Sequence, residues 1–318
     1  MLTFLLRRII TVVIPTLLGI SILVFGAMRL IPGDFVDVLI GIGPDVSEEQ
    51  RREIAKSYGL DEPVPVQYVR WLGQTLQGNM GTSLRTGEPV ASTIVDRLPA
   101  TLELAFLSTL LSLVIAIPAG VLSAVRRNGF LDAIARVVAL IGLSVPNFLL
   151  GTLLILFIST KWPVLPTNGF VPISEGLWPN LKSLVLPVLS LGALLAASIT
   201  RMARSALLEE LGKEYLIVAR AKGLSGKAVI FGHAFRNALV PVVTIVGIQT
   251  GYLLGGTVIV EQLFAIPGVG RLALDAVLKR DYPLVQGTTL FIAGTFVLVN
   301  LLTDVIYGLI DPRIRRPA

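Results

Sequence analysis

The sequence predicts an all-α integral membrane protein with six transmembrane helices. Of its 318 residues, 53% are hydrophobic and only 15% are charged, and the mean hydropathy is +0.79. These values lie far from those of soluble globular domains. The apolar residues form six runs near the length of about 20 residues that a helix needs to cross a bilayer. These runs are 9–28, 104–125, 137–160, 183–200, 238–260 and 288–310.

The first apolar run follows Arg7 and Arg8, as a signal peptide would. It is longer than the usual signal-peptide core, and no small-residue cleavage site comes after it. The segment Leu30-Ile-Pro-Gly-Asp34 follows instead. We therefore expect residues 1–31 to form a cytoplasmic N-terminus and a retained first transmembrane helix.

Residues 32–99 contain the only long polar segment and predict a small helical region outside the cytoplasm. Ser47 and Gln50 have the spacing of a capping box, which predicts a helix that ends at Gly59. A second helix is expected over 67–77, where Tyr68, Trp71 and Leu72 recur at spacings of three and four. This periodicity favours a packed cap over a mobile loop.

Residues 100–310 are expected to form the membrane core with helices two to six, followed by a cytoplasmic tail at 311–318. If the N-terminus is cytoplasmic, the cytoplasmic segments contain 15 basic and five acidic residues, and the rest of the chain contains 12 basic and 16 acidic residues. Positive charge concentrates in the cytoplasmic loops of membrane proteins. Both termini are therefore predicted to be cytoplasmic, and the pI near 9.8 gives no reason to expect nucleic-acid binding.

The cytoplasmic segment 203–237, between the fourth and fifth runs, is basic and amphipathic. It predicts two short helices broken at Gly223, which can take a left-handed conformation, with Ser225 as the cap of the second helix. One apolar face of the first helix is predicted to contain Leu207, Leu211, Tyr215 and Val218. Such a hairpin would contact either a partner protein or anionic membrane lipid.

A series of motifs along nearly the whole chain resembles the permease subunit of the dipeptide, oligopeptide, nickel and glutathione ABC importers. In order, they are Leu30-Ile-Pro-Gly-Asp34, Tyr58-Gly-Leu-Asp-Glu-Pro63, Gln67-Tyr-Val-Arg-Trp-Leu72, Arg97-Leu-Pro-Ala-Thr-Leu-Glu-Leu104, Ala219-Arg-Ala-Lys-Gly-Leu224, His233-Ala-Phe-Arg-Asn-Ala238, Glu261-Gln-Leu-Phe-Ala-Ile-Pro-Gly-Val-Gly-Arg-Leu272, Arg280-Asp-Tyr-Pro-Leu-Val-Gln286, Asn300-Leu-Leu-Thr-Asp-Val-Ile-Tyr307 and Asp311-Pro-Arg-Ile-Arg315. Each motif alone is weak evidence for this family, but so many of them in this order are specific for it.

The resemblance implies a type I ABC importer permease in the inner membrane. Its implied partners are a second homologous permease subunit, two ABC ATPase subunits that bind the ATP, and an extracytoplasmic substrate-binding protein. Peptides are the implied substrate, with nickel chelates, glutathione or another small solute as alternatives. Segment 203–237 becomes the ATPase-coupling loop, and its implied contact residues are Leu211, Tyr215, Ala219, Ala221, Lys222, Gly223, Leu224, Ser225 and His233.

The loop departs from the general permease pattern of Glu-Ala-Ala, three residues, Gly, nine residues and Ile-x-Leu-Pro. With Gly223 as the glycine, Ile217 stands at the acidic position and Arg236 at the proline. Peptide-type permeases commonly depart in this way. A contact to the ATPase that depends on that acid is therefore not expected here.

No catalytic, metal or cofactor site is expected in this chain. It has no cysteine, its single histidine is His233, and no phosphate-binding loop of the Gly-x4-Gly-Lys-[Ser/Thr] type occurs. An ion-gradient-driven secondary transporter would predict inverted repeats and charged midplane residues, and an intramembrane protease would need paired catalytic groups. Neither pattern is found.

The candidate pathway residues are Asn147, Gln249 and Asn300, which are polar positions within apolar runs. Polar groups at membrane depth face a cavity or a neighbouring helix. Hydrogen bonding between helices explains these residues equally well. Asp304, near the cytoplasmic end of the last run, is expected to have a structural role.

Overall fold

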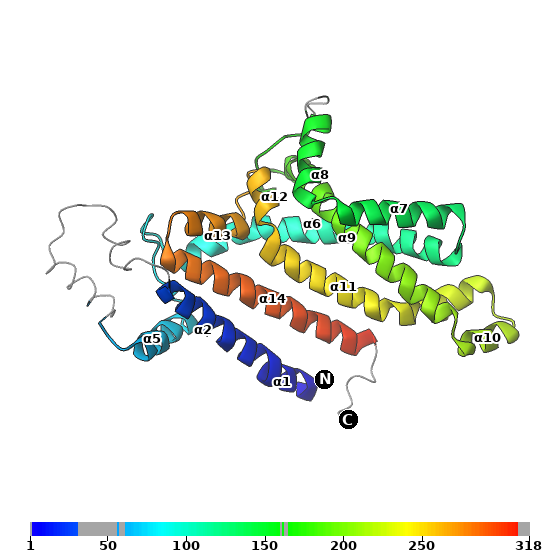
Figure 1. Cartoon of the computed structure of the whole chain (residues 1–318), viewed down its shortest axis with the longest axis horizontal. Coiled ribbons are helices and arrows are strands. Elements are labelled where there is room, and N and C mark those ends of the chain that lie inside the picture. The colour runs from blue at the N-terminus through cyan, green and yellow to red at the C-terminus, as the bar shows by residue number, and fades with distance from the viewer. Residues whose placement is uncertain (1, 31–55, 57–60, 160, 162–164, 311–318) are drawn as a thin grey trace.

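The computed structural model describes residues 2–30, 56, 61–159, 161 and 165–310, and Figure 1 shows these as an assembly of helices. The α-helices are α1 (Leu2–Arg8), α2 (Ile14–Leu30), α5 (Val64–Leu76), α6 (Val90–Val125), α7 (Phe130–Ser144), α8 (Asn147–Leu154), α9 (Leu177–Leu211), α10 (Glu214–Ala221), α11 (Phe235–Gly256), α12 (Val258–Leu263), α13 (Val269–Leu278) and α14 (Tyr282–Ile310). Three short π-helical segments adjoin these helices: η1 (Ile9–Val13) connects α1 to α2, η2 (Ile155–Ser159) extends α8, and η4 (Ala228–Ala234) precedes α11. A 3₁₀ turn, η3 (Ile173–Glu175), precedes α9.

Among the residues that the structure describes, five helical stretches are long and apolar enough to cross a membrane. They are Leu5–Arg29, Val90–Val125, Leu177–Leu211, Ala228–Gly255 and Tyr282–Leu309. They overlap five of the six predicted runs. A sixth span exists only if the bent pair Phe130–Ser144 and Asn147–Ile158 is counted as one.

The third predicted span, over 137–160, is sharply bent in the structure. α7 and α8 meet at an angle of 98°, and in Figure 1 α8 points away from the bundle while α7 lies along it. The break falls at Pro146, which lacks an amide hydrogen and forces the preceding residue out of helical geometry. Val145 accordingly has extended angles, with φ −86° and ψ 120°. The Asn147 side chain then accepts a hydrogen bond from the Phe148 amide at 2.7 Å.

The centre of the fold is the pair α6 and α9, which pack side by side. Their contact buries Leu104, Leu184, Leu191 and Ile199, and α9 is the most enclosed of the candidate spans, with 72% of its apolar window buried. Small residues allow a close approach, since a Cβ added at Gly120 would lie 2.7 Å from that of Ala203.

The helix predicted over 67–77 is confirmed as α5, which begins slightly earlier, at Val64. Its Tyr68 hydroxyl lies 2.8 Å from Ser21 Oγ on α2, and the rings of Tyr68 and Trp71 each pack 5.5 Å from the Phe25 ring. The predicted packing of α5 is therefore also confirmed. The helix predicted from Ser47 and the tail 311–318 lie outside the described residues.

The second close helix pair is α11 with α14. Gly247, Gly251 and Gly255 recur every four residues on α11, and added Cβ atoms there would lie 2.1 Å from Thr303 Oγ1, 2.8 Å from the Phe296 ring and 3.1 Å from Ile292. This glycine face lets two membrane helices approach more closely than larger residues would permit.

Candidate functional site

Segment 203–237, for which the sequence predicts a cytoplasmic location, contains the two predicted short helices at one end of the molecule (Figure 1). The first, α10, ends at Ala221, and Gly223 follows in the left-handed region with φ +83°. The Gly223 amide donates to the Arg220 carbonyl at 2.9 Å and the Leu224 amide to the Ala219 carbonyl at 3.4 Å. Ser225 Oγ accepts a hydrogen bond from the Ala228 amide at 3.3 Å and caps the next helical segment. Both local predictions, the break at Gly223 and the cap at Ser225, are confirmed.

The predicted apolar face of the first helix is wrong, because two helices contribute to it. Leu207 and Leu211 belong to the end of α9, and the chain breaks at Gly212 before α10 begins at Glu214. The break changes which residues face the protein. In α10, Leu216 is 0% exposed while Val218 is 54% exposed.

A small apolar cluster anchors this segment to the membrane helices. It joins Leu207 of α9, Leu216 of α10, Val229 of η4 and Ala238 of α11, all of which are buried. Leu211 and Ala219, two of the predicted site residues, are partly buried against the cluster. Any force on α10 therefore acts directly on the ends of α9 and α11.

A buried carboxylate, Glu210, joins α9, α10 and α11 through polar contacts. It is 5% exposed and accepts hydrogen bonds from the Tyr215 hydroxyl at 2.5 Å and the Asn237 side-chain amide at 2.9 Å. Lys213 Nζ lies 2.5 Å from its other oxygen. Asn237 also donates to the Tyr215 hydroxyl at 2.9 Å. Sequence reasoning missed Glu210, whose only signal was an acid in the last turn before a glycine.

The electrostatics of this network follow from the Glu210 carboxylate. Burial, and then the hydrogen bond to Glu210, raise the pKa of the Tyr215 phenol. The hydrogen bond to Glu210 raises the pKa of Lys213. Both donors therefore keep their protons over a wide pH range, and the network stays intact around neutrality.

The outer surface of this segment mixes apolar and basic side chains. Ile217, Val218, Leu224 and Phe231 are all exposed, and exposed Arg220, Lys222, Lys227 and His233 lie among them in the sequence. The remaining predicted site residues, Tyr215, Ala221, Gly223 and Ser225, are also exposed. We call α10 and the turn through Phe231 the coupling surface. Exposed apolar groups rimmed by charge are typical of a protein-binding face.

The three predicted pathway residues do not come together. Gln249 Nε2 on α11 donates to Ser198 Oγ on α9 at 3.2 Å, and the main-chain carbonyl of Asn147 accepts from Ser190 Oγ at 2.6 Å. Only Asn300 lines a sizeable cavity, of about 870 Å³, between the N-terminal helix, α11 and α14.

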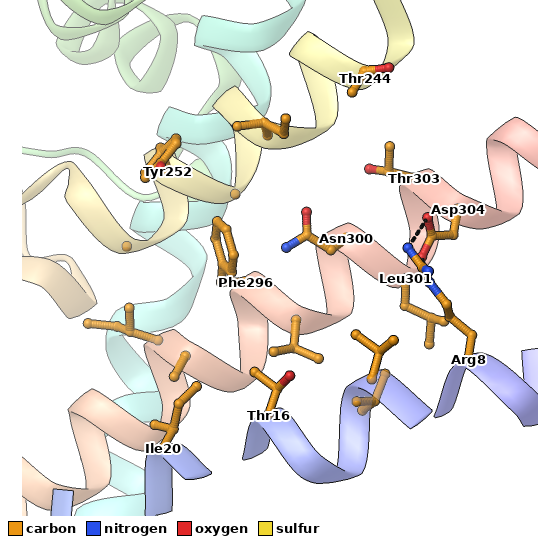
Figure 2. Close-up of a pocket in the computed structure, with 18 of the residues that line it drawn as sticks. Arg8, Thr16, Ile20, Thr244, Tyr252, Phe296, Asn300, Leu301, Thr303 and Asp304 are labelled. Atoms are coloured by element: carbon orange, nitrogen blue, oxygen red, sulfur yellow. Dashed lines mark hydrogen bonds and ion pairs between the residues drawn. The ribbon is translucent and has the colours of Figure 1, made fainter. Parts of the chain in front are cut away.

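Figure 2 shows Asn300 pointing into this cavity together with the rings of Tyr252 and Phe296. Arg8 reaches across to Asp304, with Nε 2.5 Å from the carboxylate. This ion pair between the first and last helices fits the structural role expected for Asp304. The cavity is mostly apolar, with a few polar groups on its walls.

A second buried carboxylate, Glu261, organises the opposite end of the molecule and was also missed from the sequence. It is 0% exposed and accepts from Thr101 Oγ1 at 2.9 Å, Thr257 Oγ1 at 2.8 Å and the Arg271 amide at 2.7 Å. Gly268 makes room for it, since an added Cβ would lie 2.2 Å from the Glu261 carboxyl carbon. Glu261 thereby fixes α12 and α13 to α6.

Two family models match the chain. Residues 116–316 match the binding-protein-dependent transport system inner membrane component, and residues 1–105 match the N-terminal part of a binding-protein-dependent transport system membrane component. Curated relatives cover almost the full length. A probable peptide ABC transporter permease of Sinorhizobium fredii is 42% identical over 98% of this chain and 99% of its own. The dipeptide transport system permease DppB of Escherichia coli K12 is 39% identical over 99% of both chains.

A third relative and a solved structure agree with these matches. The oligopeptide transport system permease AppB of Bacillus subtilis is 41% identical over 95% of this chain and 96% of its own. A chain of the methionine ABC transporter MetNI, solved in inward-facing conformations, superposes with a TM-score of 0.53 at 21% identity, covering 69% of this chain and 96% of that one. This last likeness concerns the fold.

Proposed function

The chain belongs to the family of binding-protein-dependent transport system inner membrane components, and on this premise we propose that it forms half of the translocation pathway of an ABC importer for peptides. It is a multi-pass membrane permease with the type I ABC importer fold. Relatives named for peptide, dipeptide and oligopeptide transport support peptides as its substrate. Nickel chelates, glutathione or another small solute are the alternatives.

The proposed partners are a second homologous permease subunit, two ABC ATPase subunits and an extracytoplasmic substrate-binding protein. ATP would bind to the ATPase subunits, since this sequence has no phosphate-binding loop, and this chain would need no cofactor of its own. The cavity beside Asn300 would form this chain's share of the pathway. A second permease would supply the rest.

The coupling surface is the observation that carries the proposal. Its exposed Ile217, Val218 and Leu224 would enter a cleft of an ATPase subunit. The Glu210 network and the apolar cluster beneath it would pass a displacement of α10 to α9 and α11. An ATPase that binds the coupling surface differently in its open and closed states would then drive alternating access.

The proposed orientation places both termini and the coupling surface in the cytoplasm. Single cysteines test this without background, because the chain contains none. Cysteines at Gly176 and Lys279 should react with an impermeant thiol reagent in intact cells, and cysteines at Asn128 and Ser225 only after the cells are opened. Reaction at Ser225 in intact cells would overturn the orientation and the coupling role with it.

Gly223 tests the coupling role directly. Its left-handed φ of +83° costs any other residue about 1 kcal/mol, yet an added Cβ meets nothing within 4 Å. We expect Gly223→Asp to leave the permease folded but to abolish transport and substrate-stimulated ATP hydrolysis in reconstituted vesicles. Lys227→Gln should be tolerated, as should Gly226→Ala, which adds a methyl group in open space without a left-handed φ.

Two rival functions predict different outcomes in the same vesicles. A hairpin that only contacts anionic lipid would lose more from Lys227→Gln than from Gly223→Asp. A secondary transporter would take up substrate as the purified chain alone, driven by an ion gradient. We expect no uptake and no ATP hydrolysis by the chain alone.

A further inference from the structure

A cavity of about 360 Å³ lies between α6, α7 and α9 and is separate from the cavity beside Asn300. One part of its wall is apolar and includes Ala139, Leu140 and Leu143 of α7. Another part is basic and includes Arg136, Arg201 and Arg204. A wall with one apolar and one cationic part suits an amphiphilic anion.

Positive charge exceeds negative charge at this cavity. Arg204 forms a bidentate pair with Asp132, with nitrogen–oxygen distances of 2.7 and 2.9 Å. Asp132 is 0% exposed, and it also accepts from Ser123 Oγ at 2.5 Å and from the Asn128 amide at 2.9 Å. This one carboxylate is therefore committed to Arg204 and to neutral donors.

The other two arginines remain available to a ligand. Arg136 Nε lies 3.7 Å from Asp132, and its side chain is 55% exposed. Arg201 is exposed, and among the described residues it pairs with no carboxylate. Among the described residues, neither guanidinium donates a hydrogen bond, and a guanidinium binds phosphate oxygens through two parallel hydrogen bonds.

The cavity lies beside the part of α9 that would extend beyond the hydrocarbon core of a bilayer. α9 has 35 residues and is about 50 Å long at 1.5 Å per residue, whereas the hydrocarbon core is about 30 Å thick. Arg201 and Arg204 directly follow the apolar run 183–200 of α9, where the helix would leave the hydrocarbon. The neighbouring face of α7 is apolar and open, with Val138, Leu140 and Ile141 exposed, as a lipid-facing surface would be.

We propose that this cavity binds an anionic phospholipid of the leaflet that faces the coupling surface. Its phosphate would lie between Arg136 and Arg201, and one acyl chain would lie along Ala139 and Leu143. Basic pockets between membrane helices on the cytoplasmic side bind lipid headgroups in this way. A free phosphate would gain the arginine contacts and nothing from the apolar wall, so the shape of the site favours the lipid.

The test uses the complete importer, purified in mild detergent from cells with mixed phospholipids. Bound phosphatidylglycerol is quantified by mass spectrometry for the native protein, for the Arg136→Gln/Arg201→Gln variant, and for a control with the same charge change, Arg126→Gln/Arg127→Gln, in the exposed turn after α6. We expect the first variant to lose about tenfold or more of its bound phosphatidylglycerol, as the loss of charge-assisted contacts predicts. The control should keep it.

A second measurement separates the lipid from a free anion. Nanodiscs of phosphatidylethanolamine with added phosphatidylglycerol should raise the thermal unfolding midpoint of the native importer but not that of the Arg136→Gln/Arg201→Gln variant. Soluble glycerol phosphate should not reproduce the rise. Equal lipid retention in both double variants, or an equal rise with glycerol phosphate, would overturn the proposal while leaving the transport function to its own tests.

Discussion

Replacing Glu210 with glutamine removes a buried charge that joins the coupling surface to α9 and α11. The carboxylate is 5% exposed, so the hydrogen bonds from Tyr215 and Asn237 are shielded from water. Both donate to the same oxygen, at 2.5 and 2.9 Å. A glutamine can keep that oxygen, but it places an amide nitrogen, itself a donor, against the Lys213 ammonium.

These contacts give an estimate of the free energy that the Glu210→Gln replacement costs. A hydrogen bond to a charged group contributes about 1.5–3 kcal/mol and a neutral one about 0.5–1.5 kcal/mol, so each of the two bonds weakens by about 1 kcal/mol. The Lys213 side chain is 49% exposed, so its pair adds at most about 1 kcal/mol. The total of about 2–3 kcal/mol corresponds to a roughly 30- to 150-fold larger population of the detached segment.

The assay is hydrogen exchange of the amides of residues 213–237 in the reconstituted importer without nucleotide, since local opening controls their exchange. We expect faster exchange in Glu210→Gln, a smaller increase in Tyr215→Phe, and weaker coupling of substrate to ATP hydrolysis in both. Glu209→Gln is the matched control, because Glu209 is the exposed neighbour of Glu210. Exchange in Glu210→Gln no faster than in Glu209→Gln would refute the reasoning.

Two further predictions concern the packing of the membrane helices. Gly247→Ala should destabilise the permease by about 1–3 kcal/mol, because its Cβ would lie 2.1 Å from Thr303 Oγ1, and thermal unfolding in detergent measures the loss. Arg204→Ala should cost more, about 3–5 kcal/mol, because it leaves the buried Asp132 without its bidentate partner, and should show as lost membrane-inserted protein or a lowered unfolding midpoint.

Each of these changes has a control, one on α14, the helix that packs against α11, and one at a second arginine that lies near Asp132. Gly294→Ala adds a methyl group where nothing lies within 4 Å, so the unfolding midpoint should hardly change. Arg136→Ala removes a half-exposed guanidinium 3.7 Å from Asp132 and should cost well under 1 kcal/mol, as for an exposed pair. A Gly247→Ala or Arg204→Ala variant no less stable than its control would contradict the close helix contact or the buried pair.

Features that depend on local chemistry could be predicted from the sequence. The hydrophobic runs located five of the candidate spans, because crossing a bilayer requires length and composition alone. Gly223 and Ser225 specified the end of α10 and the cap that follows it, because a left-handed residue and a hydroxyl acceptor act within one turn of the chain. The ordered motifs identified the family, and the comparisons confirm it.

The tertiary structure decided what depends on residues far apart in the chain. A proline such as Pro146 interrupts a helix, but the 98° turn between α7 and α8 also reflects the packing of α8 against α9 and α12. The sequence showed two acids at the end of α9, and only the fold buries Glu210 under Tyr215 and Asn237 while it leaves Glu209 in solvent.

The candidate site also combines features that the local sequence predicts with features that depend on packing. Composition and local pattern predict a membrane protein with a helical hairpin broken at Gly223, because backbone preference and hydrophobicity act residue by residue, and the ordered motifs add the resemblance to a permease. They do not predict that Leu216 faces inward, that Val218 faces outward, or that Glu261 joins α6 to α12 and α13. Burial and hydrogen-bond partners are set by packing between elements, and the local pattern of the chain does not contain that information.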